Sequence, residues 1–138
     1  MAYIIITDND TDVKDMIDNR KAAAYHPYSG SKIEDILHGE SVLIYRTKKN
    51  SAKDSRPGII AYGTAKEVFT DTVSNGKLND CACLEPFIIL STPMPFSALK
   101  SIYSNFKKKK LVFVNRTTLR IRDDYAKAII TEIKLHYM

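Results

Sequence analysis

Apolar and polar residues alternate along the chain in short segments that predict a mixed α and β structure. The opening run AYIII, residues 2–6, is apolar at every position, which is typical of a central strand buried on both faces. An i, i+3, i+4 stripe at Val13, Met16 and Ile17 then predicts a short helix that ends near Arg20. Further apolar segments predict strands at 41–47, 58–69, 84–91 and 111–114.

Capping residues predict three more helices. Ser31 opens a capping box for a helix that ends at Gly39, and Ser97 begins another helix just after Pro95. One of the two aspartates at 123–124 caps a closing helix. The strands and helices follow one another at spacings too irregular for βαβ units. The pattern therefore predicts an α+β fold or a small mixed barrel.

Length and composition indicate one ordinary domain over residues 1–138. The chain is 44% hydrophobic and 27% charged, a normal balance for a globular protein. It has no apolar run near the roughly 20 residues that span a membrane, and its N-terminus lacks the basic flank of a signal peptide. Cys81 and Cys83 alone cannot build a disulfide framework. We therefore expect a cytoplasmic protein without a membrane partner.

The net charge of +5 is unevenly distributed along the chain. Residues 1–18 hold five acids and one base, whereas residues 100–122 hold eight bases and no acid. A segregated basic tract predicts an anionic partner, with nucleic acid first and an acidic protein or lipid surface next. The lysine run 107–110 alone is typical of a solvated loop. Arg116 and Arg120 lie on a strand-like segment, which strengthens the prediction of a binding surface.

Four segments follow one another in an order that belongs to a known family. The chain opens with YIIITDNDTDVKDMI. The four segments that follow it, in order, are IEDILHGESVLIYRTKK, GIIAYGTAKEV, FIILSTPMPFSALKSI and NRTTLRIRDDYAKAI. This ordered set resembles the EVE-type domains of the PUA-like superfamily over nearly the whole chain. The chain departs from the family in having no Trp, and in having Gly39-Glu40 where many members have Gly-Asp.

The resemblance implies a mixed β-barrel of about five to six strands with short helices packed around it. It also implies a pocket that takes a modified base flipped or splayed out of a DNA or RNA strand. Unstacking a base is unfavourable, so such a pocket must restore stacking on an aromatic face. Hydrogen-bond partners must meet the base edge, and cations outside the pocket must hold the phosphates.

The chain offers aromatic and cationic residues for such a site in three places. The loop AAAYHPYSG carries an aromatic group without strand or helix periodicity, the strands at 41–47 and 58–69 each carry a tyrosine, and cations follow the first of these strands and precede the last helix. No catalytic residue, metal ligand or cofactor is predicted. The predicted nucleic-acid-binding residues are Tyr25, His26, Tyr28, Tyr45, Arg46, Lys48, Tyr62, Arg116 and Arg120.

Several of these residues also have a purely structural interpretation. Strands favour tyrosine, so Tyr45 and Tyr62 are also typical of a core or a barrel wall. His26 is typical of a turn beside a proline. Gly63, in the middle of a strand, marks either a β-bulge or the close approach of a neighbouring element.

The two arginines have an alternative as well. Arg116 and Arg120 are near Asp123 and Asp124 in sequence, and the acidic N-terminal helix offers further carboxylates. Ion pairs with these acids would remove much of the basic surface. The sequence leaves this alternative open.

An enzymatic function is the first alternative to binding. The chain has no P-loop, no GxSxG motif and no set of cysteines and histidines at metal-ligand spacing. ASCH-type relatives hydrolyse modified nucleosides with a Lys-Thr-Glu arrangement, for which Thr64, Lys66 and Glu67 are the nearest candidates. Alternation along a strand places Thr64 and Lys66 on one face and Glu67 on the other. A compact triad of these three residues is therefore not expected.

A protein-interaction module is the second alternative. A domain of this size could regulate or accompany a nuclease, an acetyltransferase or a toxin system, so a protein partner is also compatible with the sequence. Salt dependence separates this alternative from nucleic-acid binding, because binding that releases counterions weakens steeply as salt rises.

Overall fold

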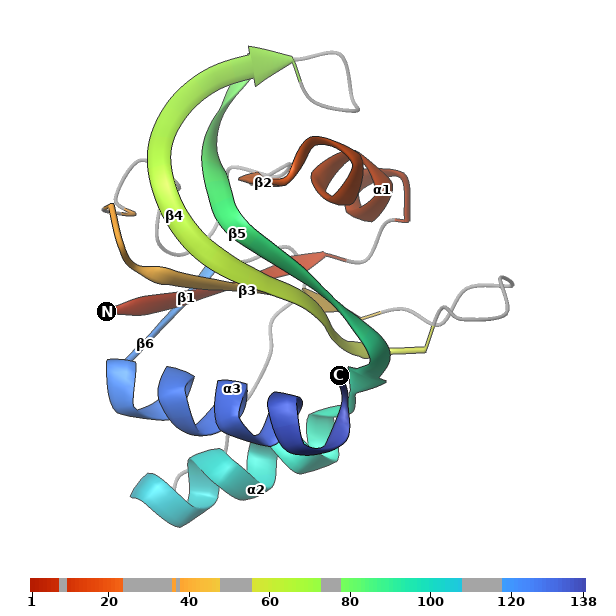
Figure 1. Cartoon of the computed structure of the whole chain (residues 1–138), viewed down its shortest axis with the longest axis vertical. Coiled ribbons are helices and arrows are strands. Elements are labelled where there is room, and N and C mark those ends of the chain that lie inside the picture. Colours follow the sequence, from red (N-terminus) through yellow and green to blue (C-terminus); the bar gives the residue numbers. More distant parts are fainter. Residues whose placement is uncertain (8–9, 24–35, 37, 48–55, 73–77, 108–117) are drawn as a thin grey trace.

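The fold is α+β, as the sequence predicts, with six strands and three helices in the described part of the chain (Figure 1). The structure is a computed structural model that describes residues 1–7, 10–23, 36, 38–47, 56–72, 78–107 and 118–138. The strands are β1 (Ala2–Thr7), β2 (Lys21–Ala23), β3 (Ser41–Arg46), β4 (Gly58–Thr72), β5 (Leu78–Met94) and β6 (Thr118–Ile121). The helices are α1 (Asp10–Asn19), α2 (Phe96–Lys107) and α3 (Asp123–His136).

The strand β1 is central and buried on both faces, which confirms the prediction made from its unbroken apolar run. It pairs in parallel with β3 on one side and antiparallel with β6 on the other. Its side chains alternate between two cores. Tyr3 and Ile5 pack on the side of α1, whereas Ile4 and Ile6 pack on the side of α2 and α3. Because both faces are covered, both sets of alternate positions are apolar from Ala2 to Ile6.

The strands β4 and β5 are long, and they bend around β2 and α1 (Figure 1). Their pairing shifts register between Gly63 and Ala65, and again between Ala65 and Glu67. A Cβ atom on Gly63 would lie only 2.6 Å from the carbonyl oxygen of Pro86. Both interpretations of Gly63 are therefore correct, because the glycine stands beside a bulge and lets β5 approach closely.

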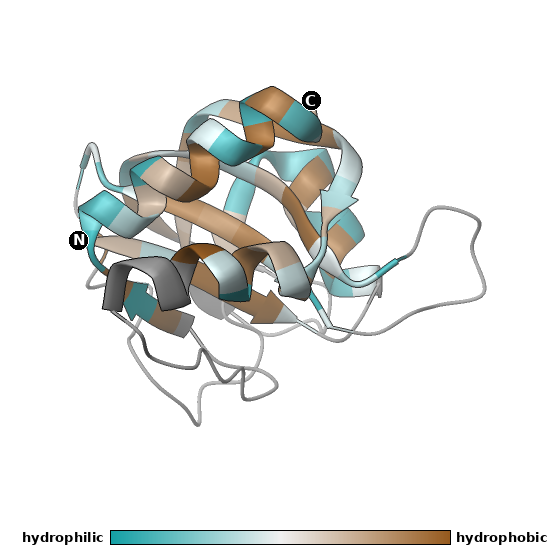
Figure 2. Cartoon of the chain, turned by 90° about the horizontal axis from the view of Figure 1, so that it is seen from below, coloured by the Kyte–Doolittle hydropathy of each residue, from teal (hydrophilic) through white to brown (hydrophobic). Residues whose placement is uncertain are grey.

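The helices α2 and α3 lie together on the opposite face of the sheet from α1 (Figure 1). Leu99 of α2 and Ile129 and Ile133 of α3 are fully buried there. Figure 2 shows apolar and polar residues alternating along α3, as expected for a helix with one face on the core. The backbone N–H and the hydroxyl of Ser91 both donate to the carbonyl oxygen of Tyr137, each at 3.1 Å, and fasten the end of α3 to β5.

Some boundaries differ from the predicted ones. β2 lies at the start of the segment expected to be a loop, and β5 extends well beyond the predicted 84–91. Pro93 does not break this strand, because it is the next-to-last residue of β5. Asp123 and Asp124 are first-turn residues of α3, and Arg122 occupies the N-cap. The predicted strand 111–114 and most of the predicted helix from Ser31 lie outside the described residues.

The predicted barrel is not formed by the described strands, which make an open sheet in the order β2-β5-β4-β3-β1-β6. β2 has three residues and pairs with β5, whereas β6 pairs with β1 at the other edge. No ladder joins these two edges in the described part of the chain, so the curvature of β4 and β5 does not close the sheet. None of the described helices is long and apolar enough to cross a bilayer.

Candidate functional site

A surface pocket of about 300 Å³ lies where β4, β5 and the turn before β3 meet. This volume is at the small end of the range for ligand pockets, about 300–1,000 Å³. Its lining combines an imidazole, a hydroxyl, an ammonium and a carboxylate. The lining residues are His38, Thr64, Ala65, Lys66 and Glu85.

The turn at Gly39 positions His38 over β4. Gly39 has a φ of +87°, a left-handed conformation that glycine adopts without strain. Its N–H donates to the carbonyl oxygen of Ala65 at 2.8 Å, and the Ala65 N–H donates to the carbonyl oxygen of Glu40 at 2.8 Å. These two bonds tie the turn to β4 and fix the backbone from which the His38 side chain projects.

A hydrogen bond to the backbone fixes the His38 ring. Its Nδ1 lies 2.7 Å from the carbonyl oxygen of Lys66. A carbonyl oxygen can only accept, so Nδ1 carries the proton in this bond. In the neutral ring the lone pair therefore lies on Nε2.

Lys66 and Glu85 form an ion pair across β4 and β5, with Nζ 2.9 Å from Oε2. The hydrogen bond to Glu85 raises the pKa of Lys66, and the hydrogen bond from Lys66 lowers the pKa of Glu85. Both side chains are more than half exposed, at 55% and 67%. The pair is therefore ionised near neutral pH and accessible to solvent, and neither group is poised to take up or release a proton.

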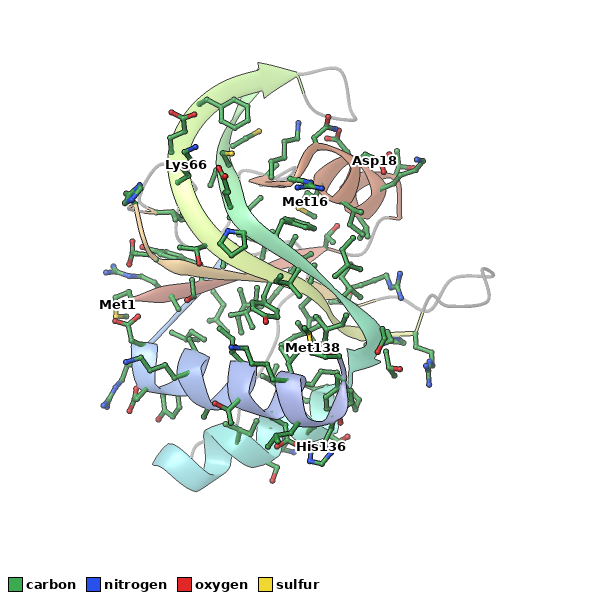
Figure 3. All side chains as sticks on the ribbon, viewed as in Figure 1. Met1, Met16, Asp18, Lys66, His136 and Met138 are labelled. Atoms are coloured by element: carbon green, nitrogen blue, oxygen red, sulfur yellow. The ribbon has the colours of Figure 1, made fainter. Side chains whose placement is uncertain are left out.

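Further charged groups continue from this pocket along the same end of the sheet. The Met1 amino group lies 3.1 Å from Oε2 of Glu40 and 3.2 Å from Oδ1 of Asp123. Hydrogen bonds to Glu40 and then Asp123 raise the pKa of this amino group. Figure 3 shows Lys66 and Met1 on the same side of the molecule. Because β1 pairs with β6, this row of charges leads from the pocket to the edge strand β6.

The tyrosines predicted to stack on a base are core residues. Tyr45 is 4% exposed and Tyr62 is 9% exposed, and both pack in the core beneath α2 and α3. Removal of each hydroxyl from water raises the pKa of both side chains. The core interpretation of these tyrosines is therefore correct, and a stacking platform made of their rings does not fit their burial.

Arg46 is also a structural residue, whereas the sequence predicted a phosphate contact. It is 8% exposed, and its Nε and Nη2 donate to the carbonyl oxygen of Arg56 at 3.3 and 2.9 Å. This contact joins the end of β3 to the residue that precedes Pro57 and Gly58 at the start of β4. The guanidinium thus closes the base of the intervening loop and does not face solvent.

Arg120, a predicted phosphate contact, lies on a strand at the edge of the sheet. It is exposed on the edge strand β6, opposite Tyr3 in the β1 ladder. Its expected acidic neighbours have other partners: Asp123 pairs with Met1, and Asp124 accepts from Arg122 at 3.0 Å. Among the described residues, Arg120 has no ion-pair partner.

The acidic helix α1 does not neutralise Arg120 either. It packs on β2, at the opposite edge of the sheet from β6. Its acids pair locally, with Asp18 2.7 Å from Lys14 and Asp15 3.5 Å from the buried Lys21. Arg120 and the acids of α1 are thus separated by the width of the sheet.

The remaining predicted site residues lie outside the described part of the chain. They are Tyr25, His26, Tyr28, Lys48 and Arg116. Their roles stay predictions.

The sequence alone did not reveal His38 and Glu85 as neighbours of Lys66. They are separated from it by 28 and 19 residues, and a bulged ladder brings Glu85 to it. The carboxylate beside Lys66 is therefore Glu85 and not Glu67, the residue that sequence proximity indicated. A signal was present in the glycines, because Gly39 and Gly63 mark the turn and the bulge that assemble the pocket.

Comparison with known proteins adds information on the fold. No family model matches the chain, and no curated protein matches it. The crystal structure of protein PSPTO5229 from Pseudomonas syringae is similar, with a TM-score of 0.62 over 96% of this chain and 99% of that chain. The two sequences are 12% identical, so the likeness concerns the fold alone.

Proposed function

We propose that this chain is a non-catalytic nucleic-acid-binding domain of the PUA-like, EVE type, which recognises a modified or flipped base in DNA or RNA. Support for the family comes from the four ordered motifs and the elements they occupy. The first motif contains the Gly39 turn and β3, and GIIAYGTAKEV lies in β4. PMPF leads into α2, and the segment RTTLRI leads through β6 into α3.

The observation that carries the binding proposal is the placement of Arg120. It is an exposed cation on an edge strand, in a segment of the chain that contains eight bases and no acid between residues 100 and 122. The nearest acids in sequence are engaged by Met1 and Arg122. A guanidinium in this position can contact a phosphate without first breaking an ion pair to the described residues.

The ion pair makes neither Lys66 nor Glu85 suited to act as a general base. A general base needs a pKa near the working pH. The ion pair moves the pKa of Lys66 up and that of Glu85 down, away from neutrality in both cases. Stacking of a flipped base between Tyr25 and Tyr28 remains part of the proposal on sequence grounds.

Fluorescence anisotropy with short labelled DNA and RNA oligonucleotides, plain and base-modified, tests the function. At two salt concentrations we expect affinity that weakens steeply as salt rises, with preference for one modified base. Absence of binding at low salt would show that the basic tract does not act on nucleic acid. Affinity for a protein partner that is insensitive to salt would instead support an interaction module.

A further inference from the structure

The pocket places a hydrogen-bond donor directly beside an acceptor on two neighbouring strands. Lys66 Nζ is the donor and Glu85 Oε2 the acceptor, 2.9 Å apart. An ammonium has three N–H groups and a carboxylate has two oxygens with about four acceptor positions. One bond between them leaves both groups with unused capacity, and both side chains are mostly exposed. A ligand can therefore bond to the two groups together without separating them.

The backbone of the pocket is already hydrogen bonded. Both polar groups of Ala65 bond to the turn at Gly39 and Glu40, and the carbonyl of Lys66 accepts from His38. A ligand in this pocket must therefore be recognised by side chains and not by the backbone. The Lys66–Glu85 pair supplies charge, and the Thr64 hydroxyl supplies a further polar group.

The His38 ring supplies a flat surface at the same pocket. Its hydrogen bond through Nδ1 fixes the ring on β4, and the side chain is exposed. Aromatic side chains, histidine included, stack on unstacked bases of nucleic acids. A planar ligand whose edge carries both acceptors and N–H groups matches this combination of ring, ammonium and carboxylate.

Guanine fits this combination best among the bases. Its O6 and N7 accept hydrogen bonds from lysine. Its N1–H and its N2 amino group point the same way, so both can donate to the two oxygens of one carboxylate. Adenine and cytosine offer a single amino group. We propose that the pocket formed by His38, Lys66 and Glu85 binds an unstacked guanine, with Lys66 on O6 or N7 and Glu85 on N1 and N2.

This inference rests on the proposed function, since the guanine belongs to a bound strand. It is a base site distinct from the one expected at Tyr25 and Tyr28. The pocket and Arg120 lie on strands of the same sheet, with β3 and β1 between β4 and β6. Arg120 projects to the α1 side of the sheet, as its ladder partner Tyr3 does, so the contact of a phosphate with Arg120 and the contact of a guanine with Lys66 are tested separately.

Nucleoside titrations of the full chain, followed by NMR, test the pocket without requiring oligonucleotide binding. We expect guanosine to shift the amide signals of His38 and of Thr64–Lys66. Inosine lacks only the N2 amino group and is expected to bind about tenfold more weakly. Glu85→Gln is expected to weaken guanosine binding about tenfold or more. Glu67→Gln, a matched change at an exposed glutamate of the neighbouring strand β4, should bind guanosine like the parent.

The outcomes separate the pocket from the proposed function. Unchanged signals with guanosine, equal binding of inosine and guanosine, or an equal loss in Glu67→Gln and Glu85→Gln would overturn the guanine site. In that case oligonucleotide binding that depends on Arg120 would still support the proposed function. Guanosine binding by a protein that binds no oligonucleotide would overturn the strand-borne guanine and the proposed function together.

Discussion

The Lys66 ammonium and the Glu85 carboxylate, 2.9 Å apart across β4 and β5, hold each other in the charged state. Replacement of Lys66 by Met should therefore raise the pKa of Glu85 toward its ordinary value of 4.5. NMR titration of the Glu85 carboxyl through the acidic range measures this change. Lys14→Met, which removes another exposed lysine from an ion pair, should leave the pKa of Glu85 unchanged.

The sign of the pH effect on stability follows from the lowered pKa of Glu85. The folded state binds a proton at this group less readily than the unfolded state does. The pair therefore contributes stability above the unfolded pKa, and the contribution is lost as pH falls through the folded pKa. Because both side chains are exposed, we expect the loss to be small. An identical Glu85 titration in the parent and in Lys66→Met would show that the ion pair does not persist in solution.

The close approach of β5 to Gly63 makes this glycine sensitive to any side chain. Gly63→Ala would place a Cβ atom 2.6 Å from the carbonyl oxygen of Pro86 and 3.0 Å from Cβ of Leu84. The backbone must move, so we expect a loss of about 1–3 kcal/mol in the free energy of unfolding, measured with urea. An unfolding free energy equal to that of the parent would mean that the two strands are further apart.

Gly39 differs because its conformation, and not its surroundings, is the constraint. A Cβ atom on Gly39 meets nothing within 4 Å, but its φ is +87°. Gly39→Ala should therefore lower the free energy of unfolding by about 1–2 kcal/mol, the strain of a left-handed residue. Gly39→Asn should lose less, because asparagine tolerates this conformation better. Equal losses for the two variants would contradict a left-handed turn.

Arg46 should affect stability more than binding. Arg46→Ala removes two hydrogen bonds to the carbonyl oxygen of Arg56 from a buried position. We expect a loss of about 1–3 kcal/mol in the free energy of unfolding. Arg56→Ala is the control, because Arg56 contributes its backbone carbonyl to this contact and its side chain is exposed. Its effect should be within about 0.5 kcal/mol. Similar losses in both variants would rule out this role of Arg46.

Periodicity predicted the elements that carry their own signal. The apolar run of β1 and the stripe at Val13, Met16 and Ile17 were sufficient to predict these two elements, because the residues of each element show by themselves which side chains are buried. β2 was not predicted, since the three residues Lys21–Ala23 carry no measurable period. β5 was predicted too short, because Pro93 and Pro95 were expected to end it. Pro93 instead occupies the next-to-last position of the strand.

The candidate site was harder to predict than the fold. Charge segregation predicted Arg120 as a binding residue; its side chain is exposed without an ion-pair partner among the described residues, and its role stays a prediction. Tyr45 and Arg46 were misassigned, because the covering helices and the Arg56 carbonyl that bury them come from other parts of the chain. The approach of Glu85 to Lys66 depends on two register shifts in the β4–β5 ladder, and alternation along a single strand cannot locate such shifts.

The salt dependence of oligonucleotide binding, compared among the parent, Arg120→Ala and Lys14→Ala, tests the central claim most directly. Arg120→Ala should weaken binding to every sequence and reduce the slope of log affinity against log salt by about one. Lys14→Ala removes the same charge at the opposite edge of the sheet and should match the parent. Parent-like affinity and slope in Arg120→Ala, or no binding by the parent at low salt, would contradict a nucleic-acid surface at β6.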